Sequence, residues 1–324
     1  MSKRYRIWTL VVAVTAFASL VTGFTSTTLG LEKMKVGSSV KLSPMYNLPF
    51  ATAEEQGFWK QNGLDAELVT FKGGAKLYQG IVAGAVNMGM SMAASELQAR
   101  ASGVPVIIVF NLNDSETFAF WVRSDSRRKK PKDVKGAKIG VMRLAGSAHA
   151  YGRMVVKELG LQKEVKFISA GGIRSSIALL RAGKTDIAVH PYHQLVKLLL
   201  KGDVRRLLKV DDYRPSKWTS YIITANQGFV KKSPDIARRV VKAMLQASKF
   251  IRGNRGWTSA KLKQMFGFSD KAAGLVYEHL QFSRDGRISP EGLANLSKFL
   301  IDFGIVPADK MPPVDELYTK QFTG

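Results

Sequence analysis

Cysteine is absent from all 324 residues. That absence excludes disulfide bonds, thiolate metal ligands and thiol nucleophiles. Several enzyme patterns are missing as well, since the sequence has no Gly-x-Ser-x-Gly elbow, no Walker loop and no Rossmann triple-glycine fingerprint. The acidic pairs Glu54-Glu55 and Asp211-Asp212 fall in an expected helix and an expected turn, where solvation explains them. The sequence therefore offers no reaction centre.

Asp and Glu are missing from the amino terminus, where Glu32 is the first acidic residue. Lys3, Arg4 and Arg6 precede an apolar stretch from Ile7 to Val21. This order predicts a secretory signal peptide over residues 1–30 and a soluble protein outside the cytoplasm. An uncleaved membrane anchor is the alternative, because no clear cleavage site stands out. No cysteine follows the apolar stretch, so lipid attachment there is excluded.

The chain is strongly basic, with a formal net charge of +24, or +21 without the three leader cations. A charge of this size suits anionic partners: nucleic acid, membrane surfaces or acidic metabolites. Most of the cations are spread along the sequence. Only Ser126-Arg127-Arg128-Lys129-Lys130 forms a compact run, and a solvated loop is its simplest interpretation.

One pattern of glycines occurs twice. Gly63, Gly73-Gly74 and Ala83-Gly84 reappear as Gly160, Gly171-Gly172 and Ala182-Gly183, at offsets of 97, 98 and 99 residues. Each copy predicts a helix end, a strand, a double-glycine turn, a helix and another strand. Two similar α/β lobes create a cleft between them, and such clefts hold small ligands.

The predicted fold is α/β, with two Rossmann-like lobes, a hinge of two crossings and a helical carboxyl-terminal region. Alternating strands and helices predict parallel sheets. Residues 34–120 and 222–324 form lobe I and residues 121–221 form lobe II in this prediction. The crossings are expected at Thr117 to Val122 and at Tyr221 to Ala225, since both runs are apolar and extended.

Two local expectations can be tested directly. The loop after the first strand is expected over Lys41 to Asn47, with a helix from about Leu48 to Lys60. In the carboxyl-terminal region, Ser233-Pro234, Ser259, Ser269 and Ser289-Pro290 are expected to open four helices, and Gly304 to close the last one.

Ligands of open α/β sheets bind beyond the carboxyl ends of the strands. The residues expected at these ends, or on the aromatic wall beside them, form the candidate binding site: Ser43, Met45, Tyr46, Ser91, Asn111, Gly146, Ser147, His149, His190, Tyr192 and Trp218.

Gly146-Ser147 carries the greatest weight in this set. The pair stands between a strand and a helix, so its backbone N–H groups are expected to bind a carboxylate, sulfonate or phosphate. A serine N-cap is the competing interpretation, and the two are compatible.

His149, His190 and His193 all fall at expected strand ends, which raises the possibility of zinc. No acidic or thiol ligand stands beside them, so ligand hydrogen bonding or structural roles are preferred and no metal or other cofactor is expected. Trp218 and Tyr221 could form the wall of a site for an aromatic substrate, although core packing is the preferred interpretation for both.

A family resemblance follows from these motifs. The first half of the chain contains three motifs in order: Glu55-x-Gly57-Phe58-Trp59, the first glycine set and Val86-Asn87-x-Gly89. The second half contains a corresponding series that runs from Asp133-Val134-Lys135-Gly136 to Asp186. This order, over about residues 34 to 250, resembles the SsuA/NMT1/THI5-like substrate-binding proteins of bacterial ABC importers.

The resemblance implies a monomeric, hinge-closing periplasmic binding protein that delivers a small molecule to an ABC permease and binds no nucleic acid. Substrate does not follow from membership. A small organic anion such as a sulfonate, carboxylate or nitrate is favoured by the basic charge and by Gly146-Ser147, with Arg143 and Arg174 as candidate cations. A thiamine-pyrimidine or another aromatic nitrogenous solute is the alternative.

Two further functions are weighed against solute binding. Family members with synthase or desulfinase activity use cysteine, which this chain lacks, so no enzymatic activity is expected. A secreted polyanion-binding protein rests on charge alone and predicts heparin or DNA retention that collapses with salt.

Overall fold

The computed structural model describes residues 30–113, 115–144 and 146–323, and Leu31–Gly324 form one compact unit. The expected signal peptide lies outside the described residues. None of the described helices is both long enough and apolar enough to span a bilayer.

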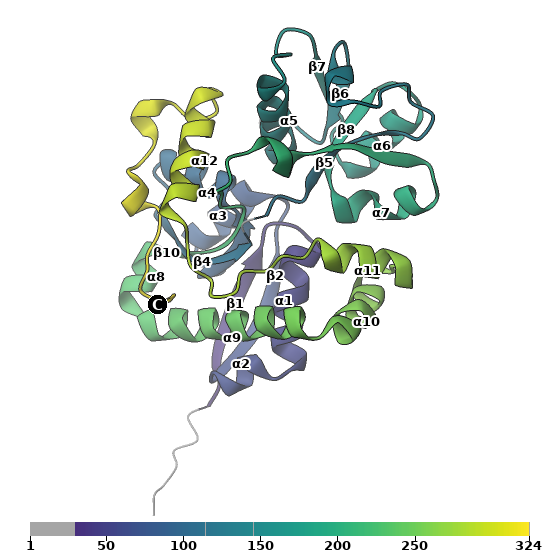
Figure 1. Ribbon diagram of the computed structural model, residues 1–324. Helices are drawn as coiled ribbons and strands as arrows, with labels where there is room; N and C mark the ends of the chain where they lie inside the picture. Colours follow the sequence, from purple (N-terminus) through teal and green to yellow (C-terminus); the bar gives the residue numbers. More distant parts are fainter. Residues whose placement is uncertain (1–29, 114, 145, 324) are drawn as a thin grey trace, which may run out of the picture. The chain divides into compact units, whose positions relative to one another are not determined.

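The described strands form two sheets of five strands each (Figure 1). Sheet A has the order β2 (Leu64–Thr70), β1 (Glu32–Ser38), β3 (Met88–Met92), β10 (Tyr221–Asn226) and β4 (Val106–Asn113). Sheet B has the order β7 (Lys166–Ser169), β6 (Lys138–Val141), β8 (Ile187–Pro191), β5 (Phe118–Arg123) and β9 (Val204–Lys209).

The two sheets have the same construction, as the repeated glycines predict. In each sheet, the first strand of one copy of the repeat lies between the second and the third, and these three strands are parallel. One antiparallel strand lies between the third strand and the fourth. That inserted strand is β10 in sheet A and β5 in sheet B. The strands of the repeat are thus parallel, as predicted, and each sheet also contains one antiparallel strand that the prediction did not include, because the inserted strands come from the segments that connect the two sheets.

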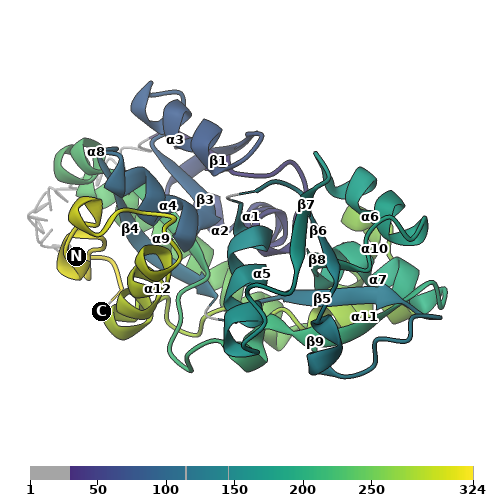
Figure 2. The same cartoon turned by 90° about the horizontal axis from the view of Figure 1, so that it is seen from above.

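Helices cover both faces of each sheet, which is the layering of a doubly wound lobe. In both views α5 (Ser147–Glu158) lies on one side of sheet B and α6 (Ile173–Arg181) with α7 (Tyr192–Leu200) on the other (Figures 1 and 2). The helices associated with sheet A are α1 (Pro44–Glu55), α2 (Phe58–Gln61), α3 (Gly74–Val82), α4 (Ala93–Ala101), α8 (Gln227–Lys232) and α9 (Pro234–Gly253).

The carboxyl-terminal region is helical, as predicted, and comprises α10 (Arg255–Phe266), α11 (Asp270–Glu278) and α12 (Pro290–Asp302). Ser269 and Ser289 are confirmed as N-caps, because their hydroxyls accept from Ala272 N and Gly292 N. Ser259 opens no helix, since α10 already begins at Arg255. Of the two single serines, Ser269 thus opens a helix and Ser259 does not.

The first helix begins earlier than predicted. Ser43 caps α1 by accepting from Met45 N, and Pro44 occupies the first helical position. The Asn47 side chain accepts from Ser43 N at 2.6 Å and closes the turn. Ser-Pro is the same start signal that opens α9, so Met45 and Tyr46 lie in the first turn of a helix and not in a loop.

The chain passes from sheet A to sheet B between Asn113 and Phe118, and returns between Tyr213 and Tyr221. Both strands that were expected as crossings are thus inner strands, one of each sheet. The lobe boundaries at 120/121 and 221/222 remain a prediction, and they fall inside β5 and β10.

Glu116 ties the two connecting segments together. Its carboxylate accepts from Thr117 N at 2.9 Å and from the Ser220 hydroxyl at 2.8 Å. Thr117 and Tyr221 share a further hydrogen bond of 2.9 Å between their hydroxyls. Burial raises the pKa of Glu116 to about 7, although the Ser220 hydroxyl lowers it. A buried carboxyl group therefore holds the point at which any hinge motion between the sheets has to occur.

Candidate functional site

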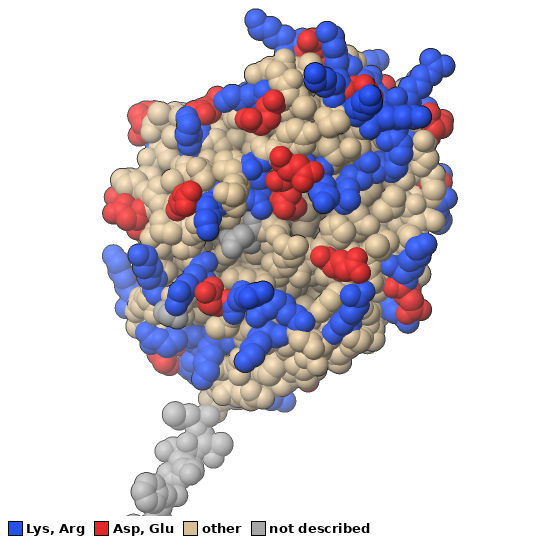
Figure 3. Space-filling model, in the orientation of Figure 1, with Lys and Arg blue, Asp and Glu red and all other residues tan. Residues whose placement is uncertain are grey.

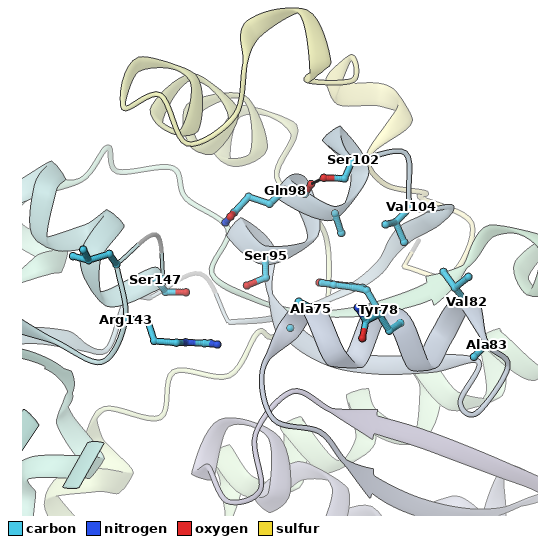
Figure 4. A pocket seen from close by; sticks show the side chains of 15 residues that line it. Ala75, Tyr78, Val82, Ala83, Ser95, Gln98, Ser102, Val104, Arg143 and Ser147 are labelled. Carbon is cyan, nitrogen blue, oxygen red and sulfur yellow. Dashed lines mark hydrogen bonds between the residues drawn. The ribbon is translucent and has the colours of Figure 1, made fainter. Parts of the chain in front are cut away.

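A cavity of about 760 Å³ lies between α3, α4 and the loop that follows β6. Its walls come from both halves of the chain: Gly74 and Tyr78 of α3 and Ser95 of α4 face Arg143 and Ser147 from the sheet B side (Figure 4). This volume is typical of sites for organic ligands. The cavity is thus the strongest candidate for a binding site among the described residues.

The polar end of the cavity is built around a double glycine. Gly73 has φ of +104°, and a Cβ placed on it would lie 3.2 Å from Arg143 Nη2. A Cβ on Gly74 would lie 2.8 Å from Ser95 Cβ. The missing side chains allow the start of α3 to approach both α4 and the guanidinium group, which is why glycine is required at both positions.

Three sources of positive potential meet at this end. The side chains of Arg143 and Ser147 point across the cavity toward Ser95 and the start of α3 (Figure 4). The amino-terminal ends of α3 and α5 carry unpaired backbone N–H groups and the positive end of each helix dipole. Gly146 is the N-cap of α5 and Ser147 its first helical residue, so the serine side chain does not cap the helix. The arrangement suits an anionic group.

The opposite end of the cavity is apolar. Val82, Ala83 and Val104 line it, and Val82 is 55% exposed. Leu144, which is 52% exposed, stands beside Arg143 at the mouth. Ligand sites are lined mostly by apolar side chains, so this wall is available to an apolar part of a ligand.

Two buried hydroxyl groups lie next to the cavity. The oxygens of Tyr78 and Ser91 are shielded from solvent, and neither makes a hydrogen bond of normal geometry with a described residue. A Cβ on Gly74 would lie 3.4 Å from Ser91 Oγ, so Ser91 stands directly behind the start of α3. Burial raises the pKa of Tyr78 well above its ordinary value, which keeps the phenol protonated as a donor.

The structure brings only part of the predicted set to this cavity. Gly146 and Ser147 line it, and Ser91 lies behind its wall. Ser43 caps α1, while Met45 and Tyr46 are buried in the hydrophobic core.

The remaining predicted residues make contacts elsewhere. Asn111 donates to Arg287 O at 3.1 Å, and the His149 ring meets Phe167 edge to face. Trp218 packs against Tyr151 and Phe299, as the core-packing interpretation expects.

His190 is fully buried, and its ring nitrogens pair with Gln194 at 2.8 Å and Ser176 at 2.9 Å. Burial lowers the pKa of His190 to about 4, so the ring is neutral at pH 7. No group of three His, Asp or Glu side chains suited to a metal occurs in the part of the chain that the structure describes. His190 therefore acts as a connector between β8, α6 and α7.

Tyr192 lines a second, smaller cavity of about 220 Å³ beside Glu116. Its ring stacks on His279 of the segment after α11, with 3.8 Å between centroids, and the Arg206 guanidinium lies over it at 5.7 Å. This contact joins sheet B to the carboxyl-terminal helices. It lies apart from the larger cavity, whose lining it does not share.

Sequence reasoning missed Tyr78 and Ser95 and placed too little weight on Gly73-Gly74. The double glycine was visible as a repeated turn, and its position before α3 is equivalent to that of Gly171-Gly172 before α6. The signal that could have identified the site was thus present in the repeat itself. Nothing in the sequence indicated which face of α3 and α4 would line a cavity.

Two mixed sheets of equivalent topology, joined by two connections and flanking a cavity, are the fold of periplasmic binding proteins. The aliphatic sulphonate binding protein SsuA of Escherichia coli has this fold, with a TM-score of 0.75 and 15% identity over 89% of this chain and 92% of that chain. The family model described as "NMT1/THI5 like" matches residues 45–254. The chain belongs to this family, which confirms the resemblance drawn from the motifs.

Two curated relatives carry different names. A putative binding protein of Brucella abortus is 25% identical over 285 residues, covering 84% of this chain and 86% of that protein. The 4-amino-5-hydroxymethyl-2-methylpyrimidine phosphate synthase THI5 of Saccharomyces cerevisiae is 23% identical over 225 residues, covering 64% of this chain. The chain spans 63% of the length of the yeast relative.

Proposed function

We propose that this protein is the periplasmic solute-binding component of an ABC importer. It captures a small organic anion that carries an apolar group, such as a sulfonate or carboxylate. The observation that carries the proposal is the convergence of Arg143 and the starts of α3 and α5 on one end of a cavity whose other end is apolar. A cavity of about 760 Å³ is far larger than nitrate needs, which disfavours that member of the predicted set.

The two halves of the cavity suggest how binding is signalled. Arg143 and Ser147 belong to the sheet B side, whereas Tyr78 and Ser95 belong to the sheet A side. A ligand that contacts both sides stabilises the closed arrangement by the contacts that only this arrangement allows. An ABC permease would then recognise the closed, monomeric protein.

The proposal assigns binding without turnover. The family resemblance associates catalysis with cysteine, and the sequence contains none. A second candidate ligand is an unphosphorylated, neutral pyrimidine, the ring class that occurs as a phosphate in the name of the yeast relatives. Because a neutral ring gains little from a guanidinium group and two helix dipoles, the two ligand classes make different demands on Arg143.

Thermal shift and calorimetry with alkyl and aryl sulfonates, carboxylates, nitrate and hydroxymethylpyrimidine test the proposal, since a bound ligand raises the melting temperature. Arg143→Gln should weaken anion binding about 10- to 100-fold, the value of a charge-assisted hydrogen bond of about 1.5–3 kcal/mol. Arg174→Gln is the matched control, because Arg174 is an exposed cation of the same lobe outside the cavity lining.

Substitutions at Ser147 separate backbone from side chain. Ser147→Pro removes a backbone N–H at a position where proline suits a helix, and Ser147→Ala removes only the hydroxyl. Proline should weaken anion binding more than alanine does. Equal anion binding by wild type and Arg143→Gln, or turnover of any solute, would contradict the proposal. Tight pyrimidine binding that ignores both substitutions would favour the second candidate.

A further inference from the structure

Sheet B is strongly basic at the end of its strands that lies away from the cavity. Three segments meet there, residues 126–138, 163–166 and 184–186, and they contain ten Lys or Arg against three Asp or Glu. We call this surface the basic patch; its cations are Arg127, Arg128, Lys129, Lys130, Lys132, Lys135, Lys138, Lys163, Lys166 and Lys184.

The strand register brings these segments together. Lys138 opens β6 and pairs in register with Lys166, which opens β7. Both residues mark the amino-terminal ends of parallel strands, whereas Arg143 and Ser147 follow the carboxyl end of β6. The basic patch and the cavity therefore lie at opposite ends of the parallel strands of sheet B. Lys and Arg side chains gather at the top right of Figure 3, over the region where Figure 1 draws β6 and β7.

Hydrogen bonds between side chains and the backbone hold residues 126–135 in place. Arg128 donates to Lys135 O at 2.8 Å, and Arg205 of β9 donates to Ser126 O at 2.9 Å. The carboxylate of Asp133 accepts from the backbone N–H groups of Lys129 at 2.7 Å and of Lys130 at 2.9 Å. These bonds fix the backbone while the lysine side chains extend into solvent.

The three acidic residues neutralise little of the patch. Glu164 pairs with Lys135 at 2.8 Å, and Asp186 pairs with Arg128 at 3.6 Å. Asp133 is engaged by backbone N–H groups, which lower the pKa of its carboxyl group. The other eight cations are exposed, and no ion pair joins them to a carboxylate of a described residue: Arg127, Lys129, Lys130, Lys132, Lys138, Lys163, Lys166 and Lys184.

The chemistry of the patch indicates the partner. Seven of the eight unpaired cations are lysines, which act as hydrated point charges and not as bidentate forks for a defined carboxylate or phosphate. No exposed large hydrophobic residue occurs among the described residues of the three segments. Protein interfaces have apolar cores that are poor in lysine, so this surface lacks what a protein partner needs. Diffuse attraction to a charged bilayer requires only a dense cluster of cations.

We propose that the basic patch docks the protein on an anionic phospholipid surface, with the cavity left accessible at the opposite end of the strands. Docking is electrostatic and reversible, and it is independent of the solute in the cavity. It would keep the protein next to a membrane in either state of the cavity.

Vesicle co-sedimentation with the full chain tests this proposal. The measured quantity is the ratio of binding to vesicles containing 30% phosphatidylglycerol over binding to pure phosphatidylcholine. Changing Lys129, Lys130 and Lys132 together to Gln should lower this ratio at least about tenfold, since each lysine near a charged surface contributes about 1 kcal/mol. The loss should be largest at low salt.

The matched control changes Lys231, Lys232 and Lys242 to Gln, three exposed lysines of α8 and α9 with the same total charge. Its ratio should stay within about threefold of wild type, and both triple variants should keep the wild-type melting temperature. Equal loss in the two triple variants would overturn the proposal, because net charge alone would explain it. Equally tight, patch-dependent binding of polyglutamate or duplex DNA would replace the lipid with that partner.

Discussion

Glu96 provides a direct test of the physical reasoning about the sheet A core. The residue lies in the first turn of α4, is fully buried, and has no hydrogen bond from a described residue to either carboxyl oxygen. Burial raises the pKa of Glu96 to about 8, and the Thr224 hydroxyl and the Arg100 charge oppose this only partly. The Thr224 hydroxyl also donates to Ile107 O, at 3.4 Å.

The direction of the pH dependence follows from this shift. An acid whose pKa is higher in the folded than in the unfolded state favours folding when it is protonated. Stability from Glu96 is therefore fully present below the unfolded pKa of about 4.3 and is lost as pH rises toward 8. Between pH 5 and pH 7 the loss amounts to roughly 2 kcal/mol, or about 5 °C in melting temperature for a chain of this size.

Glu96→Gln replaces the carboxyl group by a neutral amide of the same shape. The difference in melting temperature, variant minus wild type, should increase by about 5 °C between pH 5 and pH 7, whatever its value at pH 5. Differential scanning fluorimetry across this range provides the measurement, and Glu158→Gln, at an exposed helical position, serves as control. A difference between Glu96→Gln and wild type that stays constant with pH would refute the reasoning.

Two further predictions concern packing and charge. Gly286→Ala should destabilise the protein by about 2–4 kcal/mol in urea unfolding, because the φ of Gly286 is +72° and the new Cβ would collide with the Phe110 ring. Gly304→Ala should cost only about 1 kcal/mol, because Gly304 has a similar φ of +61° but open space around it. Equal costs for the two substitutions would contradict the packing argument. Glu55→Ala should cost more than Lys261→Met, since only the first change leaves the buried Lys261 ammonium without its carboxylate. The reverse order would show that Lys261 reaches solvent.

The repeat predicted much of the fold. The double glycines placed α3 and α6 correctly, and the serine–proline pairs marked α9 and α12. Strand direction was not predictable in the same way, because β5 and β10 have the apolar pattern of parallel core strands while running antiparallel to their neighbours. Their direction is set by partners that lie between 67 and 137 residues away in the sequence, and no local signal encodes it.

The candidate site was predictable only where backbone geometry defines it. Gly146-Ser147 was found because a strand followed by glycine, serine and a helix fixes the position of N–H groups. Tyr78 and Ser95 were missed, since an amphipathic helix shows which face is buried and not whether that face meets a core or a cavity. Tyr46 was expected in a loop and instead lies buried in the first turn of α1, because the helix start at Ser43 was not recognised.

The inserted strands have a consequence for how the chain reaches its native state. Tyr221 pairs with Asn113, its partner 108 positions earlier, and β10 fills the gap between β3 and β4. Until that late segment has been synthesised, the early half carries two exposed strand edges with nothing to satisfy them. Pairings of such long range are slow to form and delay completion. Sheet A thus contains the first strands to be synthesised, yet it is completed after sheet B.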